Sequence, residues 1–522
     1  MEEKRALLKR YFGHAAFRGG QEALIDAILS GRDVLGVMPT GGGKSVCYQL
    51  PALLLPGLTV VVSPLISLMK DQVAALTEAG IPAAFLNSSL SFEQLRSTYA
   101  KASAGQYKLL YVAPERLETE SFLSLTARVP VSLLAVDEAH CISQWGQDFR
   151  PSYLKIAAFL SALPHRPVIA AFTATATAQV RADIIGHLGL ANPLCNITGF
   201  DRPNLYFEVL HPNSKLAKTL ELVQARAGKA GIVYCATRAG VERVCEFLCD
   251  RGIAATRYHA GLSEEERREN QDDFRFDRKS VMVATNAFGM GIDKSNVSFV
   301  IHYNMPKSLE AYYQEAGRAG RDGQPARCTL LYSGTDVRTI RFFIDKEREA
   351  DNGLPADVKA EAARKAEERL KYMTFYSTTQ HCLRGFLLQY FGEAAPKKCG
   401  NCSCCLAAEQ EAQLQVEYAR RRAAQSADRL EKPRRAKPAA GSLSEADEKL
   451  LNALYAVRKR LAGKQNLPAF MVFNDATLRE MAEKKPMSID ELLNISGVGE
   501  KKAARYGNAF LRVIEDAVGS RE

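Results

Sequence analysis

Short apolar runs alternate with amphipathic stretches in the N-terminal part of the chain. From Asp33 onward the runs are DVLGVM, LTVVVS, KLLYVA, SLLAVDE and PVIAAFTA, and Leu53, Met69 and Leu95 belong to helical patterns between them. Apolar runs of this length, separated by helix-length segments, are typical of parallel strands that are joined by crossover helices. We therefore expect a first α/β lobe over residues 1–199.

A second set of the same kind begins after Asp201. Its runs are AGIVYCA, AATRYHA, SVMVATNAFG, VSFVIHYN and CTLLYSG, and SEEERRENQDDF between them has a helical pattern. These runs predict a second α/β lobe over residues 200–336. The segment from Phe200 to Asn204 contains a proline, and we expect it to be the hinge between the lobes.

The strand pattern ends after Asp336, and helical patterns follow. We expect a helical module over residues 337–406, with one helix from Lys365 to Tyr390 that packs on a cysteine cluster at its end. Tyr418 to Pro438 carries eight Lys or Arg residues against two acidic ones, which predicts a disordered basic linker over residues 407–443. Residues 444–522 have several helical patterns and are expected to form a small all-α domain.

Length and composition fit a multidomain protein with a polyanionic partner. The chain has 522 residues, of which 47% are hydrophobic and 25% charged, and no apolar run approaches the roughly 20 residues of a membrane-spanning helix. The N-terminal MEEKRALLKRYFG lacks the apolar core of a secretory signal, so we expect a cytoplasmic protein. The net charge of +10 favours a polyanion as partner.

Most of the twelve cysteines are expected to be reduced core residues, because the chain is long and has no sign of secretion. This expectation covers five cysteines in apolar surroundings: Cys47, Cys195, Cys235, Cys245 and Cys249.

The segment MPTGGGKS follows the first apolar run and precedes a helical pattern. Its small residues let backbone amides turn toward phosphates at the helix N-terminus: Thr40, Gly41, Gly42 and Gly43. Lys44 supplies a charge for the β and γ phosphates, and Ser45 a hydroxyl for a magnesium ion. Met38 stands where the strict phosphate-loop pattern has its first glycine. A purely structural glycine turn is the alternative.

Two carboxylates follow the run SLLAV. In SLLAVDEAH, Asp137 is expected to hold magnesium, and Glu138 to orient and deprotonate the attacking water. His140 lies close enough to couple this site to its surroundings. The four residues DEAH alone would also fit the start of a solvated helix. The phosphate loop that precedes them in the chain argues against this alternative.

Positive charge for the γ phosphate is available from the second lobe. In YYQEAGRAGRDG, Gln314 can touch water or phosphate, and Arg318 and Arg321 are spaced to converge on one side of a helix. Either is a candidate arginine finger, and we favour Arg321. Exposed arginines on a solvated helix are the alternative. Together with the phosphate loop, these residues indicate an ATP-driven motor.

The motifs as a set resemble one family. MPTGGGKS, SPLISLMKDQ, YVAPERL, DEAHCISQWGQDFRP, FTATA, YHAGL, VATNAFGMGIDK and YYQEAGRAGRDG are similar in order and spacing to the RecQ family of superfamily 2 DNA helicases, over about residues 5 to 405. The resemblance implies two RecA-like lobes and ATP-dependent unwinding of DNA with 3′ to 5′ translocation, in repair and recombination. It also implies single-stranded and tailed or forked duplex DNA as partner, with single-strand-binding and repair proteins as further partners. We expect a cytoplasmic, nucleoid-associated monomer.

The resemblance also implies roles for two further segments. FGHAAFRGGQ resembles the adenine-reading segment, in which Arg18 would stack on the base and Gln21 would present its amide to the base edge. His14 replaces a usual aromatic residue and Gly19 a usual proline, which predicts looser adenine selectivity. SQWGQDFRP resembles the loop that senses single-stranded DNA, through Trp145, Phe149 and Arg150. Gln147 stands where histidine is common in that loop.

The C-terminal cysteines have metal-ligand spacing. Cys382, Cys399, Cys402 and Cys405 give C-x16-C-x2-C-x2-C, the pattern of a closed structural zinc site with four thiolates. Cys404 is a competing ligand, and both the spacing and the resemblance favour Cys405. Zinc therefore joins ATP and Mg²⁺ among the expected cofactors.

The C-terminal third departs from many family members. The basic linker stands where a duplex-binding winged-helix domain is common, so we expect the linker and the zinc module to help separate strands through phosphate contacts. LPAFMVFNDATLREMA and NISGVGEKKAARYG resemble an HRDC domain, which binds single strands or proteins. In it, Phe470 would contact DNA and Gly497 to Lys502 would contact phosphate; a helical bundle with Phe470 in its core is the alternative.

Two other functions fit parts of the pattern. A DNA translocase that moves without opening strands fits the missing winged helix. A zinc-stapled DNA-binding scaffold is disfavoured by the intact Lys44, Asp137, Glu138 and Arg321. Hydrolysis and unwinding assays, run side by side, separate the three.

Overall fold

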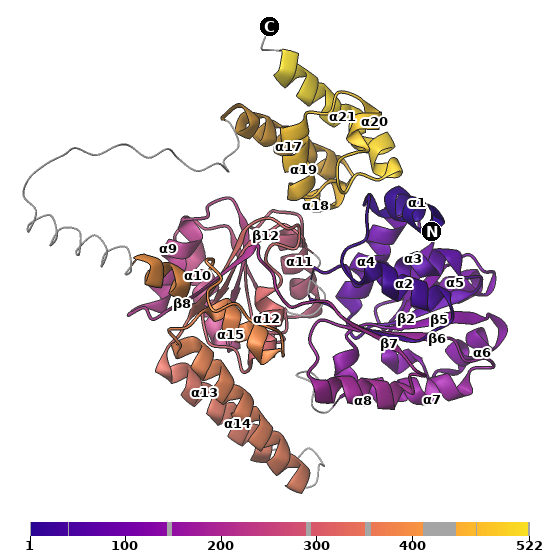
Figure 1. Ribbon diagram of the computed structural model, residues 1–522, viewed down its shortest axis with the longest axis horizontal. Coiled ribbons are helices and arrows are strands. Elements are labelled where there is room, and N and C mark those ends of the chain that lie inside the picture. Colours follow the sequence, from indigo (N-terminus) through magenta and orange to yellow (C-terminus); the bar gives the residue numbers. More distant parts are fainter. Residues whose placement is uncertain are drawn as a thin grey trace, which may run out of the picture.

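The computed structural model describes residues 2–39, 41–143, 149–288, 294–349, 356–410, 445–465 and 467–519. Two α/β lobes lie side by side, with a helical hairpin at one end of the second lobe and a C-terminal helical module above both lobes (Figure 1). The two lobes contact each other directly, because Arg275 of the second lobe forms an ion pair of 2.7 Å with Asp71 of the first.

Lobe 1 is built on a seven-stranded sheet in the order β3-β4-β2-β5-β6-β1-β7, and all of its pairings are parallel. The strands are β1 Val34–Val37, β2 Leu58–Val62, β3 Ala83–Leu86, β4 Leu109–Val112, β5 Val131–Val136, β6 Val168–Thr173 and β7 Leu194–Ile197. The helices are α1 Glu2–Leu7, α2 Gln21–Leu29, α3 Val46–Leu54, α4 Ile66–Ala79, α5 Phe92–Ser103, α6 Glu120–Arg128, α7 Lys155–Ala162 and α8 Ala178–Leu188.

The near-continuous apolar runs reflect burial on both faces of this sheet. On β5, Leu134 and Val136 pack into one cluster, and Leu133 and Ala135 pack into another. Successive strand residues point to opposite faces, so a strand covered by helices on both sides must be apolar throughout. The predicted parallel α/β layout is confirmed.

Lobe 2 repeats this plan with a six-stranded parallel sheet in the order β10-β11-β9-β12-β13-β8. Its strands are β8 Leu205–Leu210, β9 Ala230–Tyr234, β10 Ala255–Tyr258, β11 Val281–Ala284, β12 Val297–His302 and β13 Ala326–Leu331. Its helices are α9 Lys215–Gln224, α10 Arg238–Cys249, α11 Glu264–Arg275 and α12 Leu309–Ala316. All ten predicted apolar runs contain strands, whereas β3, β7 and β8 were not predicted.

The third unit begins with α13 Gly334–Glu349 and α14 Ala356–Thr378, which form the hairpin of Figure 1. The prediction of a single helix from Lys365 to Tyr390 was wrong. The chain leaves α14 after Thr378, and a new helix, α15 Leu383–Tyr390, begins with Cys382 as its N-cap. The Cys382 sulfur accepts a hydrogen bond from the Gly385 amide (3.3 Å), so the break places a cysteine at a helix start.

The C-terminal module comprises α17 Glu445–Lys464, α18 Ala469–Val472, α19 Asp475–Lys484, α20 Ile489–Leu492 and α21 Glu500–Gly519. It has its own apolar core, which includes Leu454, Phe473 and Phe510. The predicted small all-α domain is therefore confirmed. Residues 403–410 are helical, so the linker does not begin at 407 as predicted; the rest of that linker lies outside the described residues.

Two of the five cysteines expected in the core are exposed. Cys195 lies on the edge strand β7, where alternate residues face outward, and Cys249 is the last residue of the amphipathic α10. Cys47, Cys235 and Cys245 are buried as expected. Among the helices that the structure describes, we find none long and apolar enough to cross a membrane.

Candidate active site and metal centre

The phosphate loop connects β1 to α3 at the carboxyl edge of the lobe 1 sheet, where ligands bind in parallel α/β folds. Gly41 and Gly43 have positive φ angles of 82° and 79°, which side chains rarely allow. A Cβ atom at Gly43 would overlap the amide nitrogen of Gln21. Both glycines are therefore required by the local backbone and packing. Thr40 lies outside the described residues.

The N-terminal segment supports this loop. Gln21 Nε2 donates to the carbonyls of Gly42 (3.3 Å) and Gly43 (3.1 Å), and its Oε1 accepts from the Arg18 amide (2.8 Å). Arg18 Nη1 donates to the Gly41 carbonyl (2.6 Å). In this structure the Gln21 amide contacts the loop itself, a contact that the sequence did not predict. Its reading of adenine stays a prediction.

Lys44 and Ser45 follow the glycines at the start of α3. Lys44 Nζ donates to the Met38 carbonyl (3.2 Å). Burial lowers the pKa of Lys44, and the carboxylates of Glu138 and Asp137 act in the opposite direction. The lysine therefore lies within the field of both acidic residues.

Asp137 and Glu138 directly follow β5. Glu138 adopts a left-handed backbone (φ 47°, ψ 45°), which is uncommon for a residue with a side chain. Burial and the adjacent Glu138 carboxylate raise the pKa of Asp137. Burial also acts to raise the pKa of Glu138, but a hydrogen bond from His140 and the charges of His140 and Lys44 lower it overall. The two carboxylates are thus electrostatically distinct.

His140 connects Glu138 to the next strand. Its Nδ1 lies 3.3 Å from Glu138 Oε2 and 2.9 Å from Thr173 Oγ1, at the end of β6. Thr173 belongs to the FTATA motif. The predicted coupling of His140 to its surroundings therefore has a direct contact on each side.

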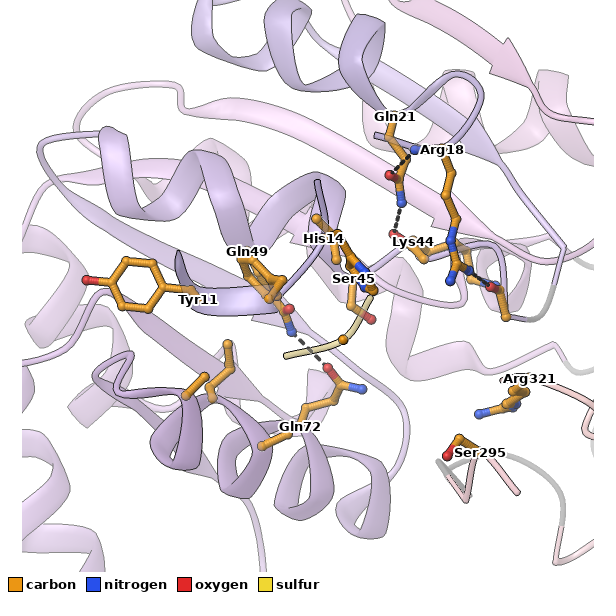
Figure 2. A pocket seen from close by; sticks show the side chains of 18 of the residues that line it. Tyr11, His14, Arg18, Gln21, Lys44, Ser45, Gln49, Gln72, Ser295 and Arg321 are labelled. Carbon is orange, nitrogen blue, oxygen red and sulfur yellow. Dashed lines mark hydrogen bonds between the residues drawn. The ribbon is translucent and has the colours of Figure 1, made fainter. Parts of the chain in front are cut away.

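Three residues of lobe 2 face the phosphate loop across the pocket. Gln314 lies on α12, whereas Arg318 and Arg321 follow it, because α12 ends at Ala316. The prediction that both arginines lie on one side of a helix was wrong. They nevertheless line one cavity of about 420 Å³ together with Lys44 and Glu138, and Figure 2 shows Arg321 opposite Lys44.

The C-terminal module forms another wall of this cavity, which the sequence did not predict. Gly497, Gly499, Lys501 and Lys502 line it. The Gly497 amide donates to the Gly13 carbonyl (2.9 Å), and Tyr506 Oη donates to Glu78 Oε1 (3.0 Å).

His14 lines the same cavity as Ser45 of the phosphate loop and Lys502 of the module, and Figure 2 shows it with the other lining residues. Burial and the charges of Arg18 and Lys502 lower the pKa of His14 to about 4, so its ring is neutral at pH 7.

Of the predicted DNA-contacting residues that the structure describes, Phe149 and Arg150 are adjacent in lobe 1, whereas Phe470 lies in the C-terminal module. Trp145 lies outside the described residues. Arg150 Nη1 donates to the Pro64 carbonyl (2.9 Å), and Phe149 beside it is half-buried. Phe470 is not part of the module's core; its ring lies 5.4 Å from Lys294 Nζ of lobe 2.

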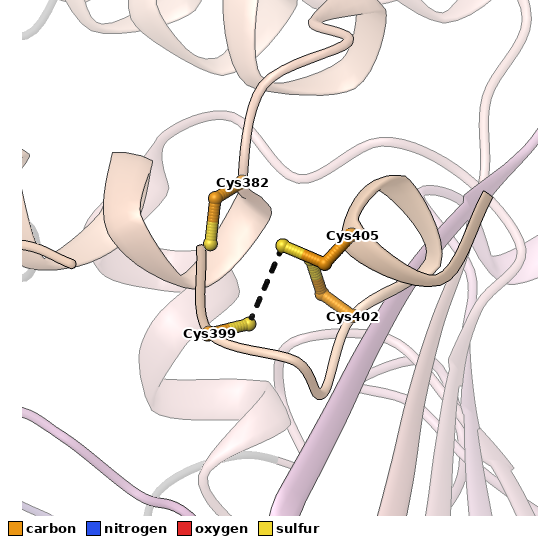
Figure 3. Close-up of side chains that lie close together, drawn as sticks. All are labelled: Cys382, Cys399, Cys402 and Cys405. Carbon is orange, nitrogen blue, oxygen red and sulfur yellow. Dashed lines mark hydrogen bonds between the residues drawn. The ribbon is translucent and has the colours of Figure 1, made fainter. Parts of the chain in front are cut away.

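The four predicted zinc ligands come together. The sulfur atoms of Cys382, Cys399, Cys402 and Cys405 lie within 4.8 Å of one another (Figure 3). In a tetrahedral site with metal–sulfur bonds of about 2.3 Å, the sulfurs are about 3.8 Å apart. The Cys399–Cys405 separation of 4.0 Å fits that geometry. Cys404 points elsewhere, with its sulfur 3.7 Å from the Thr379 carbonyl.

Family models match four consecutive parts of the chain. They are a DEAD/DEAH box helicase domain over residues 18–184, a helicase conserved C-terminal domain over 214–323, a RecQ zinc-binding domain over 334–406 and an HRDC domain over 447–514.

Two bacterial relatives align with almost the whole chain. The ATP-dependent DNA helicase RecQ of Bacillus subtilis is 40% identical, with 99% of each chain covered, and that of Pasteurella multocida is 38% identical, with 98% of this chain and 93% of the relative covered. The B. subtilis alignment has 594 positions against 522 residues here, so the relative carries segments that this chain lacks.

Solved structures support the fold. The DUF1998 helicase MrfA bound to DNA is similar with a TM-score of 0.54 at 19% identity, over 66% of this chain and 53% of that one. From the four domain matches and the full-length relatives, the chain belongs to the RecQ family of ATP-dependent DNA helicases.

Proposed function

We propose that this helicase moves 3′ to 5′ along single-stranded DNA and unwinds tailed or forked duplexes in repair and recombination. The observation that carries the proposal is the cavity in which Lys44, Asp137 and Glu138 of lobe 1 face Arg318 and Arg321 of lobe 2. A site divided between two lobes changes with their separation, so DNA that moves the lobes controls hydrolysis.

The residues have separate roles in this proposal. Lys44 and the loop amides bind the β and γ phosphates, and Glu138, with its lowered pKa, orients the attacking water and accepts its proton. Arg321 stabilises the charge that develops on the γ phosphate, with Arg318 and Gln314 beside it. His140 transmits the state of Glu138 to Thr173.

Magnesium is the expected metal at the phosphates. Ser45 and Asp137 line the same cavity and offer the hard oxygen ligands that Mg²⁺ prefers. The ion would neutralise phosphate charge there. Burial disfavours the charged form of Asp137 and raises its pKa, and a cation bound at this carboxylate would offset that cost.

DNA contacts are assigned to the segment after the DEAH motif and to the basic linker. Phe149 and Arg150, with Trp145, offer stacking faces and a guanidinium to bases. The net charge of +6 over Tyr418 to Pro438 offers phosphate contacts that help to separate strands. Deleting residues 418–438 is expected to reduce unwinding and its salt dependence; unchanged values of both would contradict this role.

A translocase that does not separate strands is the second candidate, because the B. subtilis alignment contains segments absent from this chain. DNA-stimulated ATP hydrolysis is therefore measured beside unwinding of duplexes with 3′ or 5′ tails. We expect unwinding of the 3′-tailed duplex only. Hydrolysis without unwinding would favour the translocase, and unwinding of the 5′-tailed duplex alone would reverse the proposed direction.

A further inference from the structure

Residues 199–204, between β7 and β8, connect the two lobes. On one side this connector contacts the helical module of residues 337–406, which carries the cysteine cluster. Arg384 of α15 donates to Asp201 Oδ1 (2.6 Å) and to the Arg202 carbonyl (2.6 Å). The Phe200 ring stacks on Phe391 with centroids 4.6 Å apart. This segment was predicted as a hinge, and these contacts fix its backbone to the helical module.

On its other side the connector forms hydrogen bonds with the segment that carries the candidate arginine fingers. We call residues 317–322, which follow α12, the finger turn. Arg202 Nη2 donates to the carbonyls of Ala319 (3.0 Å) and Gly320 (2.8 Å), and Nη1 donates to that of Gly317 (3.3 Å). These carbonyls follow the C-terminus of α12, where backbone acceptors lack helical partners and a cation is favourable.

Asn204 also forms hydrogen bonds with the finger turn and the residues after it. Its Nδ2 donates to the carbonyls of Gly320 (2.9 Å) and Gln324 (2.9 Å). Gly320 has a φ of 56°, and a Cβ atom there would lie 2.5 Å from Asn204 Nδ2. The glycine therefore permits both the turn and the close approach of the connector.

Arg202 also reaches the phosphate loop. A Cβ atom at Gly41 would lie 3.4 Å from Arg202 Nη1 and 3.6 Å from the Arg321 Cα. The same guanidinium that holds the finger turn thus packs beside the loop that this turn faces. Burial lowers the pKa of Arg202, but from an ordinary value so high that the side chain stays charged.

From these contacts we infer that Arg202 is a positioning residue for ATP hydrolysis: it fixes the finger turn against the phosphate loop. The inference rests on the proposed role of Arg321. Small displacements of a charged group from its productive position lower the rate of a reaction strongly, whereas ground-state binding depends less on them. A lysine has a single ammonium in place of the planar fork, so it cannot serve three carbonyls equally.

The test compares Arg202→Ala, Arg202→Lys and Arg321→Ala in the full chain, with Arg278→Ala as a control. Arg278 is an exposed arginine of the same lobe, paired with Asp273. DNA-stimulated kcat and KM are measured, together with the Kd of ADP and of ADP with aluminium fluoride, a transition-state analogue. We expect Arg202→Ala to lower kcat at least about tenfold and weaken analogue binding similarly, with the Kd of ADP within about threefold. Arg202→Lys should recover only part of this loss.

The results for Arg321→Ala and Arg202→Ala distinguish a failure of the role proposed for Arg321 from a failure of the role inferred for Arg202. If Arg321→Ala keeps its kcat, the proposed role of the finger turn fails first. If Arg321→Ala loses activity and Arg202→Ala does not, the inference is overturned. It is also overturned if Arg202→Ala weakens ADP binding in proportion to kcat, because the arginine is then a ground-state ligand.

A second variant covers the case in which Arg202→Ala does not fold. Asn204→Ala removes the two hydrogen bonds to Gly320 and Gln324 and the one that Asn204 Oδ1 accepts from Arg202 Nε (3.3 Å), while the Arg202 side chain stays in place. We expect a smaller fall in kcat, about threefold to tenfold, with unchanged ADP binding and unchanged circular dichroism. A wild-type kcat in a folded Asn204→Ala protein would contradict the inference.

Discussion

Glu138 combines an uncommon backbone with a low pKa at the end of β5. Its left-handed conformation directs the side chain into the cavity, and His140 keeps its carboxylate charged. Glu138→Gln preserves the shape of this side chain but cannot accept a proton. We expect kcat for ATP hydrolysis to fall about 10²- to 10³-fold with little change in nucleotide Kd.

The matched control for that substitution is Glu118→Gln. Glu118 is exposed and pairs with Lys155 on the surface of lobe 1. Its kcat should equal that of the wild type. Single-turnover hydrolysis with DNA is the measurement, and a Glu138→Gln protein that hydrolyses ATP at the wild-type rate would contradict the assigned role.

Motifs of residues that lie close together in the sequence could be recognised, whereas contacts between residues far apart in the sequence could not be predicted. MPTGGGKS and DEAH predict Lys44 and Glu138 as site residues because the chemistry needs those residue types at fixed spacing, and the structure places both in one cavity. The hydrogen bond from Gln21 to the phosphate loop joins residues more than twenty positions apart. No local pattern encodes such a contact, and the same amide would suit a base edge.

At the scale of elements, burial explains which strands were found. Strands with two covered faces show near-continuous apolar runs, as β2 and β5 do, each with a single Thr or Ser. The edge strand β7 has the sequence LCNI and alternates toward solvent, so it carries too little signal over four residues. The predicted helix over 365–390 failed because helical periodicity continues through Thr378 to Cys382, where a ligand cysteine instead begins a new helix.

The cysteine cluster offers a matched pair for testing the metal centre. Cys402 is fully buried in the cluster, next to β8, whereas the adjacent Cys404 points to Thr379. Cys402→Ser is expected to release zinc and lower the melting temperature, because a closed site with four thiolates contributes folding energy. Cys404→Ser should keep one zinc per chain by elemental analysis. Zinc loss from Cys404→Ser, or full retention in Cys402→Ser, would contradict the ligand set.

At the scale of the whole molecule, the C-terminal module bridges both lobes over the nucleotide cavity. Glu78 of α4 accepts from Arg505 and Tyr506 of α21, and Lys294 of lobe 2 lies against Phe470. Such surfaces are complementary only after each domain has folded, so the sequence predicted the module and not its position.

Charge reversal tests this docking. We expect Glu78→Arg to place two positive charges together and detach the module, which small-angle scattering would record as a larger radius of gyration. The double variant Glu78→Arg with Arg505→Glu restores opposite charges and should return the radius toward the wild-type value. Equal radii for all three proteins would contradict a docked module in solution.

Docking should also depend on pH through Lys502, which lines the cavity and donates to the Met471 carbonyl (2.6 Å). Burial lowers the pKa of Lys502 to about 8, against the opposing effect of Glu78. A detached, solvated lysine has a pKa of about 10.4, so between these values the docked state binds fewer protons. Rising pH therefore favours docking over this window, and below pH 8 the buried charge opposes it fully.

Lys502→Met removes this titration while keeping most of the side-chain volume. Energy transfer between fluorophores on lobe 1 and the module, followed from pH 7 to 10, should show docking that strengthens with pH in the wild type and stays flat in Lys502→Met. Other groups that titrate near pH 10 affect both proteins equally, so the difference between the two curves isolates Lys502. Parallel curves would show that burial of this lysine is not linked to docking.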